Sequence, residues 1–163
     1  MGTGNSGRYS GTKGSKAFPG SIDYMAPGDP FSTSIKKRKD IDVNGFHDVI
    51  AHGTTGTVLI EHNGQQIEVD HRTLSRLLSY NKESSGKAIR LLSCNTGKVD
   101  SGFAQNLANK LNRPVKAPTE YLWARSDGTY FVVGGKKING KLVPDMSNPG
   151  KFKTYKPRKE KKK

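Results

Sequence analysis

The sequence predicts an α/β fold in which a mainly parallel sheet carries flanking helices and antiparallel edge hairpins. Short apolar runs alternate with two amphipathic helical segments, a pattern typical of parallel strands joined by crossover helices. In addition, Asn63-Gly64 and Asn139-Gly140 each separate two β-type runs. Asn-Gly between such runs is the strongest short-range signal for a hairpin, so these pairs predict the antiparallel part of the fold.

The predicted elements begin at Phe46. Asp70 can cap the first helix, and either Asp100 or Ser101 can cap the second, which must end before Pro114. In chain order we expect a strand at 46–53, a hairpin of 57–62 and 65–69, a helix at 71–81, a strand at 89–93, a helix from about residue 100 to 111, and strands at 115–118, 121–124, 129–133, 136–138 and 141–143.

Two segments lie outside this pattern. Residues 1–45 hold eight glycines and three prolines without a helix or strand period, so we expect an irregular N-terminal segment ahead of a catalytic α/β domain at 46–150. The Gly- and Ser-rich start suggests a piece released from a larger polypeptide. Residues 151–163 are expected to form a basic, disordered tail.

The net charge of +14 is concentrated in that tail, which holds eight Lys and Arg against Glu160, and in Lys36–Lys39. Clustered basic side chains can bind phosphate, so nucleic acid is a possible partner of the tail. A solvated tail, or one that meets an acidic protein, is the alternative.

Other protein classes are excluded by composition. The chain has one cysteine, so it has no internal disulfide. It contains no apolar run of 18 residues and does not begin with a basic and then apolar signal, so we expect neither a membrane span nor a secretion peptide.

The candidate chemistry lies at two predicted strand ends. Cys94 follows the apolar run Ile89–Leu92, and His52 ends the run that begins at Phe46. If the two strands are parallel neighbours, their ends meet at one sheet edge, where an imidazole can activate a thiol. The positive end of the helix starting near residue 100 is expected to lower the thiol pKa further. The N–H groups of Gly53 and Cys94 can hold an oxyanion.

This layout resembles a known family over residues 46 to about 133. A His-Gly strand end, a hairpin, a helix and then a Cys strand end are similar to the caspase-like (clan CD) cysteine peptidases. More narrowly, Leu91–Gly97, Phe103–Ala108 and Val115–Thr119 resemble C-terminal toxin domains of bacterial polymorphic toxins, whose signature is His, Asp or Asn, and Cys. The resemblance implies a caspase-like sheet, peptidase activity, a secreted or delivered effector that acts inside a target cell, and a neutralising immunity protein. One departure is that Gly97 follows Cys94 by three positions instead of two.

The third signature residue is ambiguous. Asp70 lies between His52 and Cys94 in the required order, although helix capping explains it equally well, and Asp48 is a second candidate. We expect no cofactor and no metal, because His47 and His52 point to opposite faces of an extended run. Tyr121 and Trp123 are expected in the core or in a pocket wall.

Three functions follow from these residues. The first is a protease in which Cys94 attacks a peptide carbonyl and His52 transfers the proton. The second is a glutamine deamidase or transglutaminase that uses the same groups. The third is a non-enzymatic module whose basic residues bind nucleic acid or an acidic partner.

Overall fold

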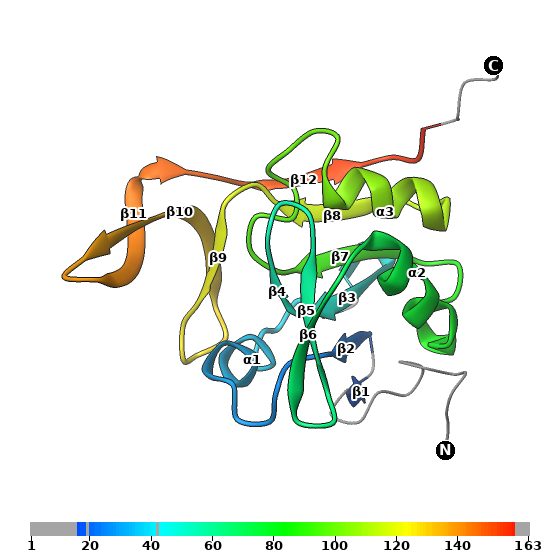
Figure 1. The fold of residues 1–163 in the computed structure, drawn as a ribbon, viewed down its shortest axis with the longest axis horizontal. Coiled ribbons are helices and arrows are strands. Elements are labelled where there is room, and N and C mark those ends of the chain that lie inside the picture. Colours follow the sequence, from blue (N-terminus) through cyan, green and yellow to red (C-terminus); the bar gives the residue numbers. More distant parts are fainter. Residues whose placement is uncertain (1–15, 19, 42, 159–163) are drawn as a thin grey trace.

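The computed structural model describes residues 16–18, 20–41 and 43–158 (Figure 1). Its largest sheet has six strands, which in spatial order are β1 (Lys16–Phe18), β2 (Ser21–Asp23), β3 (Phe46–Ile50), β7 (Ala88–Leu92), β8 (Val115–Pro118) and β12 (Phe152–Tyr155). The inner pairs β2/β3, β3/β7 and β7/β8 are parallel, and the outer pairs β1/β2 and β8/β12 are antiparallel. The predicted mixed α/β class with a mainly parallel sheet is therefore confirmed.

Both predicted hairpins are present. The first joins β5 (Val58–His62) to β6 (Gln65–Val69), and the second joins β10 (Tyr130–Ile138) to β11 (Lys141–Pro149). Asn and Gly have positive φ at both tips, which is the backbone of a type I′ turn and explains why Asn-Gly is placed there. The prediction that these hairpins lie at the edge of the large sheet is wrong. They form separate sheets with β4 (His52–Gly53) and β9 (Tyr121–Ala124), and the β10–β11 hairpin extends away from the body of the molecule (Figure 1).

Within the described residues, three α-helices connect these strands: α1 (Pro30–Ile35), α2 (His71–Ser79) and α3 (Phe103–Leu111), with 3-10 turns at Val43–Gly45 and Lys82–Ser84. Asp70 caps α2 as predicted, since its carboxylate accepts the N–H of Thr73 at 3.0 Å. Gly102 takes the N-cap position of α3, so the prediction of Asp100 or Ser101 there is wrong.

The two faces of the large sheet pack against different elements. Successive strand residues point to opposite faces, and Val49 and Leu91 belong to one apolar cluster with α2 and α3 while Ile50 and Leu92 belong to another. That second cluster includes Ile35 of α1 and Leu122 of β9. The helices α2 and α3 thus cover one face, and α1 and β9 cover the other.

The prediction of an irregular segment up to residue 45 is wrong for its described part. This segment contains β1, β2 and α1, and β2 is a full member of the parallel sheet. Strands of three residues are too short to show a period, and β2 is held by pairing with β3, which lies more than 20 residues later in the chain. Residues 1–15 of the predicted segment lie outside the described residues.

The prediction of a disordered basic tail is also wrong where the tail is described. Residues Phe152–Tyr155 form the edge strand β12, with Lys153 opposite Ala117 of β8. Tyr155 is buried, and its hydroxyl donates to the carbonyl of Gly97 at 2.6 Å. Residues 159–163 lie outside the described residues. No helix in the part of the chain that the structure describes has the length and apolar character needed to cross a membrane.

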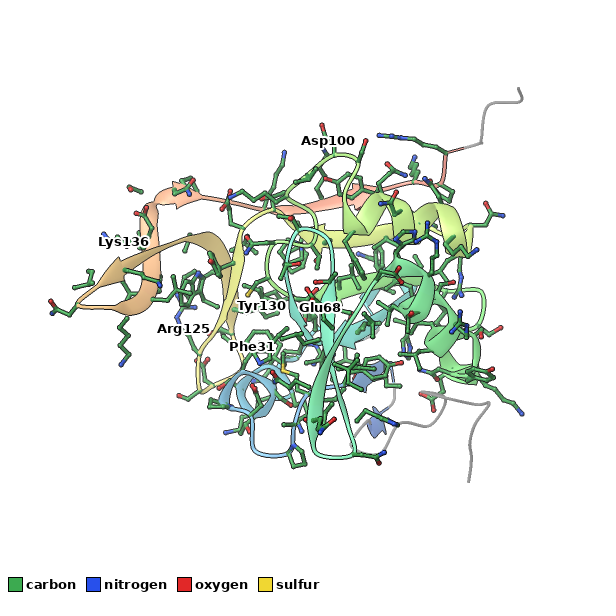
Figure 2. The ribbon with its side chains drawn as sticks, in the orientation of Figure 1. Phe31, Glu68, Asp100, Arg125, Tyr130 and Lys136 are labelled. Atoms are coloured by element: carbon green, nitrogen blue, oxygen red, sulfur yellow. The ribbon has the colours of Figure 1, made fainter. Side chains whose placement is uncertain are left out.

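A buried ionic network lies on the face covered by α1 and β9. Asp48 of β3 is fully buried between two guanidinium groups, with Arg38 Nη2 at 2.7 Å and Arg90 Nη2 at 2.6 Å from its Oδ2. Arg90 also donates to Asp40 at 3.0 Å and to the hydroxyl of Tyr130 at 2.9 Å (Tyr130 is labelled in Figure 2). Burial would lower the pKa of Arg90, but Asp48 and Asp40 raise it, so Arg90 stays charged.

This network joins segments that are far apart in the chain. Arg38 also donates to the carbonyl of Ile35, the last residue of α1, at 2.9 Å, while Arg90 belongs to β7 and Tyr130 to β10. Burial and the Asp40 carboxylate raise the pKa of Tyr130 to about 12, so the phenol remains a donor. The loop after α1 and the start of β10 are therefore both anchored on the central strands.

We predict that Asp48→Asn destabilises the protein by about 3–5 kcal/mol, because it leaves two buried guanidinium groups without their shared carboxylate. Asp145→Asn is the matched control, since Asp145 is only half-buried, lies in β11 away from the network, and accepts hydrogen bonds from its neighbour Ser147. Urea unfolding of both variants measures the difference. Equal midpoints for Asp48→Asn and wild type would contradict a structural role for the network.

Candidate active site

His52 and Cys94 lie at the same edge of the large sheet. β3 and β7 are adjacent and parallel, with Ile50 opposite Leu92, and each candidate residue follows two positions later. The predicted juxtaposition of the two strand ends is therefore confirmed. The predicted single strand at 46–53 is divided, however, because β3 ends at Ile50 and His52–Gly53 form β4, which pairs with β5.

His52 is held by a carboxylate that sequence analysis missed. Its Nε2 lies 2.7 Å from Oδ2 of Asp29, while Oδ1 of the same carboxylate accepts the backbone N–H groups of Phe31 and Ser32. Asp29 thus caps α1 and binds His52 at the same time. Burial would raise the pKa of Asp29, but the hydrogen bonds from His52, Ser32 and Phe31 hold it below its usual value.

The bond to Asp29 determines which imidazole nitrogen remains for chemistry. An ionised carboxylate is an acceptor only, so Nε2 carries a proton in this pair. Nδ1 is then the ring nitrogen that can accept a proton from a thiol. A short sequence signal for Asp29 does exist, since Asp followed by Pro is a common helix start, but it indicates capping and not contact with His52.

Neither carboxylate that the sequence suggested as a third member contacts His52. Asp70 bonds to Thr73 and Arg72 at the start of α2, and its side chain is 44% exposed. Asp48 is enclosed by Arg38 and Arg90 in the buried network. The carboxylate that contacts His52 is instead that of Asp29, which precedes His52 in the chain.

The Cys94 thiol is bonded to the backbone of Leu122. Its Sγ accepts the N–H of Leu122 at 3.4 Å and its S–H faces the carbonyl of the same residue at 3.7 Å. Burial raises the pKa of the Cys94 thiol above its ordinary value, and the N–H of Leu122 offsets this only in part. The expected lowering of this pKa is therefore wrong, and the sulfur rests as a thiol at neutral pH.

The hydrogen bonds at the start of α3 explain why the helix dipole does not lower the pKa of Cys94. The helix does point at the turn after Cys94, as predicted, but the N–H of Phe103 donates to Thr55 O and that of Ala104 to Thr96 O. These carbonyls, and not the sulfur, receive the first helical amides.

Gly53 packs directly against the turn that carries Cys94. A Cβ built at Gly53 would lie 2.8 Å from the carbonyl oxygen of Cys94 and 3.0 Å from Cβ of Ser93. The N–H of Thr54 donates to Thr57 O, and antiparallel pairs alternate, so Gly53 occupies a non-hydrogen-bonded pair with Val58 and its N–H points away from β5. The absence of a side chain at Gly53 thus allows this close contact with the turn that carries Cys94.

His52 and Cys94 open into one pocket of about 330 Å³. Phe31, labelled in Figure 2, extends from α1, and its ring centroid lies 6.3 Å from that of His52. Tyr121 and Trp123 also line the pocket, as predicted for a pocket wall. The other lining residues are Pro30, Ser34, Ala51, Leu122, Ala124 and Leu142. In the described part of the chain, no group of three or more His, Cys, Asp or Glu is placed to hold a metal ion.

We predict that Gly53→Ala destabilises the protein by about 1–3 kcal/mol, because the added methyl group meets backbone atoms of the cysteine turn that cannot move freely. Gly56→Ala is the control: it lies in the same loop region, and a Cβ there meets nothing within 4 Å. Its effect should stay within about 0.5 kcal/mol. Urea midpoints of the two variants that agree with each other would contradict the close packing of Gly53.

Comparison with protein families places these residues in one unit. A family model described as a domain of unknown function (DUF8616) matches residues 20–132, a range that contains Asp29, His52 and Cys94. No curated protein matches the chain. The matched range covers more than half of the sequence and includes β2 and α1, which had been assigned to a separate irregular segment. The chain belongs to the DUF8616 family of domains of unknown function.

Proposed function

We propose that this chain is a cysteine peptidase in which Cys94 is the nucleophile, His52 the base and Asp29 the residue that orients His52. One observation carries the proposal: His52 is bonded to Asp29 at 2.7 Å and shares a pocket with Cys94 at the ends of two parallel strands. A nucleophile, a base and a third group that orients the base are the parts required for acyl transfer through a covalent intermediate.

In the proposed reaction, His52 transfers one proton while the thioester forms and one proton while the thioester is hydrolysed. Sγ of Cys94 attacks the carbonyl carbon as its proton passes to Nδ1 of His52, and the Asp29 carboxylate stabilises the imidazolium. The C–N bond then breaks, and His52 gives the proton to the departing amine. Water next attacks the thioester and releases a proton to His52, which returns it to the sulfur as the acid leaves. Because the resting sulfur is a thiol, His52 must act as a true base.

The oxyanion is assigned to the N–H groups of Gly53 and Cys94. The contact of Gly53 with the cysteine turn brings the two backbone segments together, and the Gly53 N–H points away from β5. Two such donors stabilise the developing charge by about 3 kcal/mol each where this has been measured.

We assign the biological setting from the resemblance to polymorphic toxin domains and to caspase-like peptidases. His52 follows β3 and Cys94 follows β7, two adjacent parallel strands, and this order supports the caspase-like comparison. On this proposal the domain is a delivered effector that cleaves a protein of the recipient cell, and an immunity protein neutralises it in the producer.

We predict that Cys94→Ala abolishes toxicity on expression in bacteria and that His52→Ala lowers the rate of product formation by about 10²–10⁴-fold. His71→Ala, a histidine at the start of α2, should retain activity. Lysate treated with each protein is analysed by mass spectrometry for new protein N-termini and for conversion of Gln to Glu.

New termini that need Cys94 support the peptidase, whereas Cys94-dependent conversion of Gln contradicts it in favour of a deamidase. A third arm tests the binding module: residues 159–163 are deleted, because removing 151–163 would also remove β12 from the sheet. Toxicity that is lost on this deletion and kept in Cys94→Ala would contradict the enzyme.

We predict that Asp29→Asn lowers the cleavage rate by roughly 10-fold, less than His52→Ala, since an orienting residue contributes less than the base itself. Asn is as good an N-cap as Asp, so α1 should remain capped and the unfolding midpoint should change little. Asp70→Asn is the matched control, because Asp70 caps α2 in the same way without contacting His52. Equal rates for the two variants would remove Asp29 from the mechanism. The measurement is the initial rate on a peptide spanning a mapped cleavage site.

A further inference from the structure

The pocket beside Cys94 is lined mainly by apolar and aromatic side chains. None of its lining residues is Lys, Arg, Asp or Glu, and His52 is already bonded to Asp29. The indole N–H of Trp123 donates to Val133 O at 3.0 Å, and the Tyr121 ring lies 5.8 Å from the indole. The polar atom of Trp123 is therefore occupied within β10, and its ring surface is what the pocket receives.

The edge of β9 that faces away from β10 forms the wall next to the sulfur. The N–H of Arg125 donates to Thr129 O, so alternation along the β9/β10 ladder directs the backbone groups of Leu122 and Ala124 away from β10. Those of Leu122 meet Cys94 Sγ. The backbone N–H and carbonyl of Ala124, two residues further along β9, point to the same side as those of Leu122, and Ala124 lines the pocket. An extended peptide can pair with this edge and carry a carbonyl carbon to the sulfur.

The size of the pocket limits what enters it. Small-molecule pockets span roughly 300–1,000 Å³, and about 330 Å³ is at the lower end of that range. Such a volume takes one large side chain. The side chain nearest to the attacked carbonyl carbon is that of the same residue, because only the α-carbon separates them.

We propose that this pocket selects the residue on the N-terminal side of the scissile bond and that it accepts a large apolar side chain such as Leu, Met or Phe. This inference rests on the proposed peptidase function and names its substrate class. A Lys or Asp side chain would lose its hydration in the pocket without an opposite charge to pair with, since Asp29 is engaged by His52.

The test uses dipeptide chloromethyl ketones that alkylate a thiol and differ only in the side chain next to the reactive group: Leu, Phe, Lys or Asp. The chain has one cysteine, so intact mass reports labelling of Cys94, and Cys94→Ala gives the background. We expect the Leu and Phe reagents to label at least about tenfold faster than the Lys and Asp reagents. Equal rates, or faster labelling by a charged reagent, would overturn the assignment.

Two matched variants locate the selectivity. Leu142 lines the pocket and Ile138 lies at the tip of the same hairpin, and both side chains are exposed, so neither substitution should disturb folding. Leu142→Asp should slow the Leu reagent and accelerate the Lys reagent, whereas Ile138→Asp should change neither rate. If both variants are labelled at wild-type rates by both reagents, this pocket does not select the side chain next to the reactive group.

Failure of the activity and failure of this inference are separable. Cys94-dependent cleavage in lysate at sites preceded by charged residues would overturn the apolar preference and leave the peptidase standing. Apolar selectivity in labelling, with no Cys94-dependent cleavage of any protein, would contradict the peptidase while supporting an apolar pocket at Cys94.

Discussion

The site depends on a buried carboxylate that two arginines share. Asp48 holds Arg38, which anchors the end of α1, and Arg90, which reaches Asp40 and Tyr130 at the start of β10. α1 supplies Phe31 to the pocket and its N-cap Asp29 bonds to His52, while β10 supports β9 behind Leu122 and Trp123. Apolar packing alone allows such covering elements to slide, whereas charged partners must meet at one register because an unpaired buried charge is costly. The network therefore sets where both pocket walls lie over the sheet.

Within that frame, the backbone of β9 controls the state of the sulfur. Leu122 presents both its N–H and its carbonyl to Cys94, so the thiol occupies the place of a neighbouring strand residue. The N–H favours the thiolate and the carbonyl favours the thiol, while burial adds to the second effect. The backbone of Leu122 thus positions the sulfur without lowering its pKa, and in the proposed mechanism activation of the thiol falls to the Asp29–His52 pair. The pair and the sulfur come from elements that only the tertiary structure brings together.

Sequence reasoning succeeded where the signal is local. Asn-Gly at both hairpin tips, Asp70 as the cap of α2, and apolar runs at β3 and β7 are each encoded within a few residues. It failed where partners are distant: β2 is stabilised by β3, and β12 by β8 and by the bond from Tyr155 to Gly97. Asp29 combines a local and a distant role. Its capping of α1 can be predicted from the Asp-Pro pair, whereas its bond to His52 spans 23 positions and has no local signal. The pKa of Cys94 likewise depends on burial that composition does not reveal.

The distribution of charge separates the basic surface from the pocket. Arg38 is buried against Asp48 despite its place in a basic run, so a run of like charges in the sequence is not a solvated patch at every position. In β12, Nζ of Lys153 forms an ion pair with Oδ1 of Asp100, in the loop before α3, at 2.7 Å. No residue of β12 lines the pocket. The basic strand and the Cys94 pocket therefore occupy different elements. Lys153 of β12 can be substituted without changing any residue that lines the pocket, which keeps a test of the proposed binding module separate from a test of the proposed peptidase.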